Sequence, residues 1–251
     1  MVIGVSGKLG SGKDTVGLII QALTEENLVI EEIADIATGK LALPKSNWEI
    51  KKMAGKLKEI ASILLGVPVE KFEDRAFKES YLPEKWDYIL LETDMGGYQE
   101  MHAVESPMHL SLKHLSLKRD FDSIKPNRMT VREFLQRLGT DAMRHGLHPN
   151  TWANAFWEDY KPKSWKAIEG KPVGMYPDWI ITDVRFPNEA DSVLNHGGIL
   201  IRVNRDGDTG NHPSETGLDN WKLWNYVIDN NGSIFDLIIK IEEILKLEEI
   251  L

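Results

Sequence analysis

The sequence predicts an α/β fold with a parallel sheet, and two observations support this prediction. Short apolar runs typical of buried strands alternate along the chain with longer stretches in which apolar residues recur at helical spacing. Strands that alternate with helices need crossover connections, which leave neighbouring strands parallel. In addition, the first strand, at residues 2–5, leads directly into a glycine-rich turn and then a helix.

Residues 7–15 connect this strand to the helix, and their spacing indicates phosphate binding. Gly7 and Gly12 bracket four residues and Lys13 follows, as in the first seven positions of the pattern G-x-x-x-x-G-K-[ST]. Glycines allow backbone N–H groups to turn inward around a phosphate, and the helix start adds the positive end of its dipole. The alternative, a glycine-rich turn without a ligand, is disfavoured because a strand precedes the loop and a helical pattern follows it.

The loop departs from the pattern at its eighth position, where Asp14 stands in place of Ser or Thr and Thr15 comes one residue later. In most such loops a hydroxyl at this position contacts Mg²⁺. Asp14 either takes the metal-side role itself or serves as a first-turn carboxylate of the helix while Thr15 and Asp183 face the metal. We favour a role for Asp14 near the metal.

Composition excludes several classes of function. The chain has 251 residues, a net charge of −9 and no cysteine. The acidic balance argues against non-specific nucleic-acid binding, and the lack of cysteine removes disulfides, thiolate nucleophiles and cysteine-based zinc sites. Because the chain begins with a short strand and has no apolar run of about 18 residues, we expect a cytoplasmic protein without membrane contact.

The middle of the chain predicts two helices separated by an insertion. Apolar residues recur at helical spacing over residues 54–65 and stop at a glycine, which is a typical helix end. Residues 80–127 read as an insertion, with a candidate strand at residues 89–92. A capping-box pattern then opens a second helix over residues 130–144.

This second helix has two faces. Its apolar residues form a core stripe, while Arg132, Gln136 and Gly139 lie three or four residues apart on a neighbouring stripe and Thr140 follows. An exposed polar surface and a ligand-facing surface both fit this pattern. The small Gly139–Thr140 pair beside the charges favours the ligand-facing surface.

The C-terminal half continues the alternation of strands and helices. We expect a helix at residues 152–160, a Pro/Gly-rich loop at residues 161–177, strands at residues 179–183, 199–203 and 226–228, and helices beginning at Pro187 and Ser233. In open parallel sheets, ligands bind beyond the carboxyl ends of the strands. Asp183 ends one of these strands and is therefore placed where a metal-associated carboxylate would lie.

Six segments together resemble the phage-type deoxynucleoside monophosphate kinases. In chain order they are GKLGSGKDT, WEIKKMAGKLKEIASILLG, FLQRLGTDAMR, WIITDVRFPNEAD, HPSETGL and VIDNNGS. The resemblance covers most of the chain and is weakest over residues 25–45 and 80–127. It implies a P-loop kinase fold in a single domain over residues 1–251, in which helices flank a parallel sheet, a helical substrate-binding insertion spans about residues 45–150, and a short lid spans about residues 204–217.

The resemblance also implies roles for individual residues. The residues implied to bind the ATP phosphates and Mg²⁺ are Gly7, Gly10, Ser11, Gly12, Lys13, Asp14 and Thr15, and Asp183 is implied to lie on the metal side. The residues implied to contact the acceptor monophosphate are Lys58, Arg75, Arg132, Gln136, Gly139 and Thr140. A further cluster at a strand end consists of Asp183, Arg185 and Glu189. Arg205 is the implied lid arginine, Asn230 and Gly232 lie on a turn that faces adenine, and the implied catalytic cations are Lys13, Arg132, Arg185 and Arg205.

The activity implied by the resemblance is phosphoryl transfer from ATP with Mg²⁺ to a deoxynucleoside monophosphate. The expected partner is this small nucleotide, with a possible homodimer and no nucleic acid or membrane. Two alternatives remain open, namely another P-loop small-molecule kinase, such as one acting on a coenzyme precursor, and a nucleotide-dependent switch protein. The absence of an N-K-x-D guanine-reading motif argues against the switch.

Overall fold

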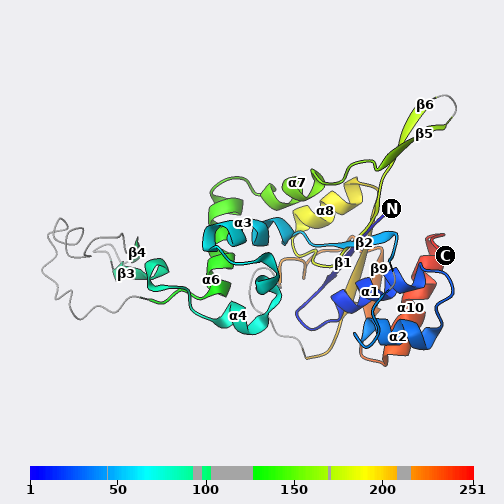
Figure 1. Cartoon of the computed structure of the whole chain (residues 1–251), viewed down its shortest axis with the longest axis horizontal. Coiled ribbons are helices and arrows are strands. Elements are labelled where there is room, and N and C mark those ends of the chain that lie inside the picture. Colours follow the sequence, from blue (N-terminus) through cyan, green and yellow to red (C-terminus); the bar gives the residue numbers. More distant parts are fainter. Residues whose placement is uncertain (44, 93–97, 103–126, 169–170, 208–215) are drawn as a thin grey trace, which may run out of the picture. The chain divides into compact units, whose positions relative to one another are not determined.

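A computed structural model describes residues 1–43, 45–92, 98–102, 127–168, 171–207 and 216–251 (Figure 1). The chain divides into two compact units. Unit 1 comprises Met1–Lys56 and Asn150–Leu251, and unit 2 comprises Leu57–Pro149. Parts of the insertion predicted at residues 80–127 and of the lid predicted at residues 204–217 lie outside the described residues.

Unit 1 contains the strands and helices that precede and follow the second unit in the sequence. Its strands are β1 (Val2–Gly7), β2 (Trp48–Lys51), β5 (Ser164–Ile168), β6 (Lys171–Met175), β7 (Asp178–Ile181), β8 (Ile199–Asn204) and β9 (Tyr226–Asp229). Its helices are α1 (Lys13–Leu23), α2 (Ile30–Ala37), α7 (Thr151–Trp157), α8 (Pro187–Asn195) and α10 (Ile234–Leu247).

Five of the described strands of unit 1 form one parallel sheet in the order β2-β7-β1-β8-β9. All six residues of β1 are buried, and Ile3 pairs with Ile180 of β7 on one side and Ile199 of β8 on the other. The central strand is therefore the one that leads into the glycine-rich loop. The predicted α/β fold with a parallel sheet is confirmed.

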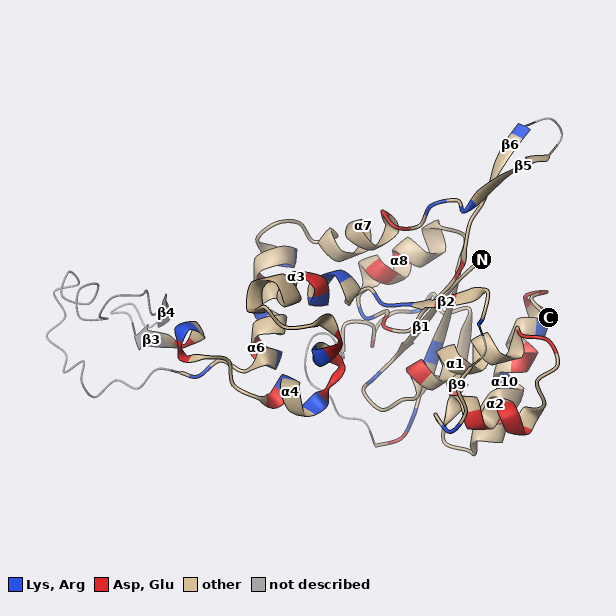
Figure 2. Cartoon of the chain, viewed as in Figure 1, with Lys and Arg blue, Asp and Glu red and all other residues tan. Residues whose placement is uncertain are grey.

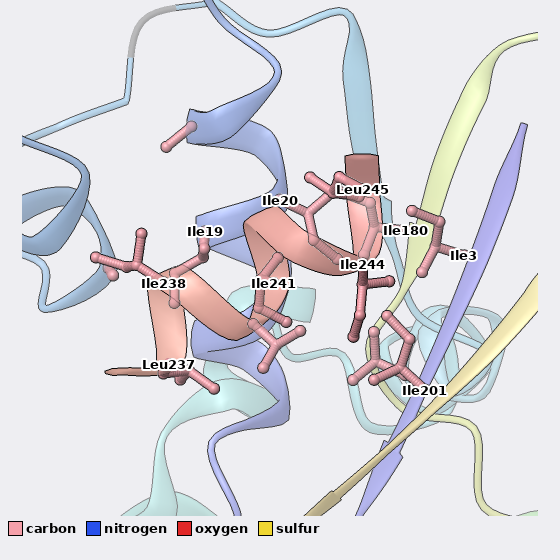
Figure 3. Close-up of a cluster of buried hydrophobic side chains, with 14 of the residues drawn as sticks. Ile3, Ile19, Ile20, Ile180, Ile201, Leu237, Ile238, Ile241, Ile244 and Leu245 are labelled. Atoms are coloured by element: carbon pink, nitrogen blue, oxygen red, sulfur yellow. The ribbon is translucent and has the colours of Figure 1, made fainter. Parts of the chain in front are cut away.

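Helices cover both faces of this sheet. On one face, α1, α2 and α10 pack against the strands through a core that includes Ile19, Ile20, Ile238 and Ile241, which Figure 3 shows at the α1 and α10 ribbons, to one side of the strands. On the other face, α7 and α8 contribute Phe156 and Val193 to a second core. Burying apolar surface on both faces explains why the strands read as continuous apolar runs.

The outer helices of unit 1 carry much acidic charge. Figure 2 shows Asp and Glu residues on both α2 and α10, in keeping with the net charge of −9. Within the described part of the chain, no helix is both long enough and apolar enough to cross a bilayer.

Two elements of unit 1 differ from the sequence prediction. Residues 161–177 were expected to form a loop, which is wrong, because β5 and β6 pair there as an antiparallel hairpin. The described residues of this hairpin are almost all exposed, so it lacks the alternation of buried and polar residues that predicts a strand. The strand β2 was also not predicted, and its Glu49 is held by hydrogen bonds from Lys163 and Lys51, which lower the pKa of the Glu49 carboxyl.

Unit 2 is mainly helical. Its elements are most of α3 (Gly55–Leu65), α4 (Arg75–Glu79), α6 (Val131–Gln136), the short 3₁₀ turns at Val69–Glu73 and Glu84–Trp86, the hairpin of β3 (Tyr88–Glu92) and β4 (Tyr98–His102), and a π-helical segment at Arg137–His145. Its core is built around Phe72, Met129 and Phe134. The helix predicted over residues 130–144 is present, but its winding widens at Arg137.

Candidate functional site

The loop between β1 and α1 has the backbone conformation that its glycines predict. Gly10 and Gly12 have φ angles of 81° and 95°, in the left-handed region that other residues rarely adopt. Gly12 directly precedes α1, so the first N–H groups of that helix, which have no partner within it, lie at the loop. A loop of this geometry at a helix start suits an anion.

Lys13 is the first residue of α1, and its side chain is buried at the loop. Its side chain is only 7% exposed, and its Nζ donates a hydrogen bond of 3.1 Å to the carbonyl oxygen of Lys8. The backbone N–H of Ser11 donates to the same carbonyl at 3.2 Å. The carbonyl of Lys8 therefore both closes the turn and positions the ammonium group of Lys13.

Asn230, which follows β9, ties the loop to the strand ends. Its Nδ2 donates to the carbonyl oxygen of Ser11 at 2.9 Å, and its backbone N–H donates to that of Asn204 at 2.8 Å. The hydroxyl of Ser11 is buried and has no hydrogen-bond partner among the described residues. A buried hydroxyl without a partner at this loop fits a donor that a phosphate oxygen would satisfy.

Asp14 extends from the start of α1 toward the carboxyl end of β7. Its Oδ1 accepts a hydrogen bond of 2.9 Å from the hydroxyl of the buried Thr182 and lies 3.4 Å from Nζ of Lys52, while the side chain stays 63% exposed. Across the described ranges, no three His, Cys, Asp or Glu side chains form a group that could hold a metal ion. Mg²⁺ commonly keeps its water and phosphate ligands, so a single exposed carboxylate at the loop fits it.

Asp183 fixes the chain that leads from β2 into α3. Its Oδ1 accepts from the backbone N–H of Met53 at 2.7 Å, and its Oδ2 accepts from that of Ala54 at 3.0 Å. Burial raises the pKa of the Asp183 carboxyl, against the opposing effect of these two hydrogen bonds. Both oxygens therefore have backbone partners, and the role of Asp183 toward a metal stays a prediction.

Arg185 and Glu189 lie at the start of α8. Glu189 is 2% exposed, and its Oε2 accepts from the backbone N–H groups of Arg185 at 2.8 Å and Phe186 at 3.2 Å. Glu189 thus caps the helix and holds the backbone of Arg185, whose side chain is half-buried. The substrate roles of both residues stay predictions.

Gly232 also has a structural reason for its identity. A Cβ atom there would lie 2.6 Å from Oδ2 of Asp236, which accepts hydrogen bonds from the backbone N–H and hydroxyl of Ser233 at the start of α10. A side chain at position 232 would therefore displace the Asp236 carboxylate that caps the helix. The expected contact of this turn with adenine stays a prediction.

A cavity of about 400 Å³ opens beside the loop. It is lined by Lys8, Ser11, Arg202, Val203, Asn204, Arg205, Leu218, Asp219, Trp224 and Val227. Three cations and one carboxylate give the lining a net positive charge, which suits a phosphorylated ligand. Arg205, the lid arginine of the sequence analysis, is exposed in this lining.

Three charged residues of the cavity were not selected from the sequence. Asp219 lies 3.3 Å from Nζ of Lys8 and 3.4 Å from Nη2 of Arg202, and Arg202 also donates to the hydroxyl of Ser6 at 3.2 Å. The one local sign was Arg202 itself, which interrupts the apolar run of β8. Its partners are distant in sequence, so local patterns did not reveal them.

Unit 2 holds the remaining predicted cations, each beside a carboxylate. Nζ of Lys58 lies 2.6 Å from Oε1 of Glu73, and the guanidinium of Arg132 donates twice to Oε1 of Glu79, at 2.8 and 2.6 Å. The hydrogen bond from Arg132, together with the charges of Arg132 and the exposed Arg75, lowers the pKa of the Glu79 carboxyl. Arg75 and Arg132 are therefore near one another in unit 2.

The predicted ligand-facing stripe of unit 2 coincides with the change in helix winding. Gln136 ends α6, while Gly139 and Thr140 lie in the π-helical segment that follows. Gly139 is buried, and a Cβ atom on it would lie 3.1 Å from Cδ2 of Leu57. Such wide turns are frequent at functional sites, but the nucleotide contacts of these residues stay predictions.

Comparisons with known proteins agree on one family. A family model described as deoxynucleotide monophosphate kinase matches residues 88–241. A protein of Acanthamoeba polyphaga mimivirus is 35% identical over 114 residues, which are 42% of this chain and 55% of that protein. The deoxynucleotide monophosphate kinase of Enterobacteria phage T4 is 32% identical over 119 residues, which are 47% of this chain and 46% of that protein.

A third relative matches at lower identity over nearly its whole length. The deoxynucleoside-5'-monophosphate kinase of Escherichia phage T5 is 23% identical over 269 residues, covering 99% of this chain and 97% of that protein. For the mimivirus and T4 relatives, by contrast, the chain spans about half of the length of the protein it matches.

Proposed function

The chain belongs to the deoxynucleotide monophosphate kinase family, and on this premise we propose that it transfers the γ-phosphoryl group of ATP to a deoxynucleoside monophosphate. The products are ADP and the deoxynucleoside diphosphate. The observation that carries the proposal is the loop after the central strand β1, where two left-handed glycines, a buried lysine and a serine hydroxyl without a partner in the described part of the chain meet at a helix start.

The loop holds the phosphates of the donor in this proposal. The N–H groups at the start of α1 and the Ser11 hydroxyl bind phosphate oxygens, and Lys13 exchanges the carbonyl of Lys8 for an oxygen of the migrating group. Phosphoryl transfer needs little covalent help, so positioning and charge neutralisation supply most of the catalysis. Asp14 would hold Mg²⁺ beside the loop, and the bound ion would supply neutralisation of the phosphate charge.

The remaining cations divide between the two nucleotides. We assign Arg205, which lines the cavity beside the loop, and Arg185 to the transferring phosphoryl group. We assign Lys58, Arg75 and Arg132 of unit 2 to the acceptor monophosphate, whose oxygens take the place of the carboxylates now paired with Lys58 and Arg132.

A coupled ADP-release assay tests the proposal. Purified protein is supplied with ATP and Mg²⁺ and, in turn, each deoxynucleoside monophosphate, each ribonucleoside monophosphate, a panel of coenzyme precursors and no acceptor. We expect turnover with at least one deoxynucleoside monophosphate. Lys13→Ala should reduce it about a hundredfold or more with unchanged circular dichroism, because it removes a charge aimed at the transferring group.

Lys166→Ala provides a matched control for this loss. It removes the same charge from β5, on the exposed hairpin, and should leave turnover unchanged. Turnover restricted to a coenzyme precursor would refute the proposed acceptor in favour of another small-molecule kinase. Slow hydrolysis that no acceptor accelerates would favour a nucleotide-dependent switch.

The proposal includes a small nucleotide as the partner of the chain. It also includes a homodimer that is located in the cytoplasm. Light scattering after gel filtration measures the mass of the assembly, and fractionation of expressing cells locates it. A monomeric mass or a membrane-bound fraction would contradict it.

A further inference from the structure

Asp219 connects two parts of unit 1 that meet at the phosphate loop. Its Oδ2 lies 3.3 Å from Nζ of Lys8, in the loop, and its Oδ1 lies 3.4 Å from Nη2 of Arg202, in β8. Each carboxylate oxygen thus faces a different cation. Leu218, which is 3% exposed, and a hydrogen bond from the N–H of Asp219 to the carbonyl of Thr216 fix the backbone at this position.

Arg202 provides a rigid anchor for this carboxylate. Its side chain is only 12% exposed, it donates to the hydroxyl of the buried Ser6, and its guanidinium lies 5.6 Å from the ring centre of Trp224. A planar guanidinium held on three sides loses little further freedom when it binds a carboxylate. Asp219 is therefore held from the side of β8 and can in turn hold Lys8.

Lys8 connects Asp219 to the part of the loop that would bind the donor phosphates. Its carbonyl accepts the hydrogen bonds of the Ser11 N–H and the Lys13 ammonium. Holding the Lys8 side chain therefore restrains the peptide that closes the loop and aims Lys13. Because Lys8 and Asp219 are about one-third exposed, their ion pair contributes little to the stability of the fold.

We propose that Asp219 is a positioning residue that preorganises the phosphate loop through Lys8, with Arg202 as its anchor. The inference rests on the proposed function for its kinetic consequence, but not for its effect on phosphate binding. If Asp219 acted only through its negative charge, it would repel a polyphosphate, and removing that charge would tighten polyphosphate binding. Preorganisation of the loop predicts weaker binding instead, so the two explanations differ in the sign of the change.

Calorimetric titration with inorganic tripolyphosphate measures loop binding without any kinase reaction. Asp219→Asn should weaken this binding about two- to fivefold, the factor that corresponds to a partly exposed ion pair. Unchanged or tighter binding would overturn the inference, as would the absence of binding by the unmodified protein. Asp191→Asn, which removes the same charge from an exposed position on α8, is the matched control and should not weaken binding.

A double-mutant cycle tests whether Asp219 acts through Lys8. We expect Asp219→Asn to add little to the loss caused by Lys8→Met, whereas additive losses would refute the link. Asp219→Glu should recover part of the affinity, which a purely steric role would not allow. In the kinase assay the KM for ATP should rise while that for the acceptor stays constant, and inactivity of the unmodified protein with all acceptors would refute the proposed function alone.

Discussion

Gly12→Ala should destabilise the protein by about 1 kcal/mol more than Gly10→Ala, although both glycines lie in one loop with similar backbone angles. Both have φ in the left-handed region, at 95° and 81°. A methyl group added at Gly10 would have nothing within 4 Å, whereas one added at Gly12 would lie 2.5 Å from Nδ2 of Asn230. The pair therefore separates backbone strain from a collision with one side chain.

The magnitudes follow from these contacts. A left-handed alanine costs roughly 1–2 kcal/mol, which is the whole effect expected at Gly10. At Gly12 the methyl group also displaces Asn230, whose hydrogen bond to Ser11 contributes about 1 kcal/mol. We therefore expect a loss of about 2–3 kcal/mol for Gly12→Ala.

Urea unfolding of the two variants measures the difference. The comparison is valid if the free energy of unfolding of both variants depends on urea concentration with the same slope as that of the unmodified protein. Asn230→Gly should remove the collision with a methyl group at position 12. The double variant of Gly12→Ala and Asn230→Gly should therefore be no less stable than the double variant of Gly10→Ala and Asn230→Gly. Equal losses for the two single alanine variants would refute the contact between Gly12 and Asn230.

Three further predictions address the acceptor, the metal and pH. Arg132→Gln should raise the KM for the acceptor about tenfold or more, because a contact between guanidinium and phosphate is lost. Arg128→Gln, in the same unit, should leave this KM unchanged. Equal effects of the two variants in steady-state kinetics would mean that the helix face at Arg132 is structural. Asp14→Asn should raise the Mg²⁺ concentration needed for half-maximal turnover, and if Thr15→Val does so instead, the metal contact belongs to Thr15. Glu49→Gln should cost at most about 1 kcal/mol at pH 7. Because the folded protein lowers the pKa of Glu49, this difference should disappear as the pH falls through the carboxyl range, and a difference that persists at pH 3 would contradict the ion pairs as its source.

Local patterns in the sequence determined the elements whose signals are complete within one segment. The loop from Gly7 to Lys13 and the cap of α10 at Ser233 and Asp236 are of this kind, because each depends on backbone angles and hydrogen bonds between residues a few positions apart. The apolar runs of β1, β7 and β8 are equally explicit, since strands buried on both faces are apolar over most of their length.

Tertiary structure decided the features that depend on distant partners. The strand β2 has only two apolar residues, Trp48 and Ile50, so it lacks the continuous apolar run of the other strands, and its pairing with β7 defines it. The metal-side role of Asp183 stays a prediction, but the N–H groups that its two oxygens accept lie about 130 residues away in the sequence, so these hydrogen bonds could not be predicted. The contacts of Asp219 with Lys8 and Arg202 were hidden for the same reason. Sequence patterns report local conformation, whereas the partner of a charged side chain is set by which strands and loops the fold brings to the same edge of the sheet.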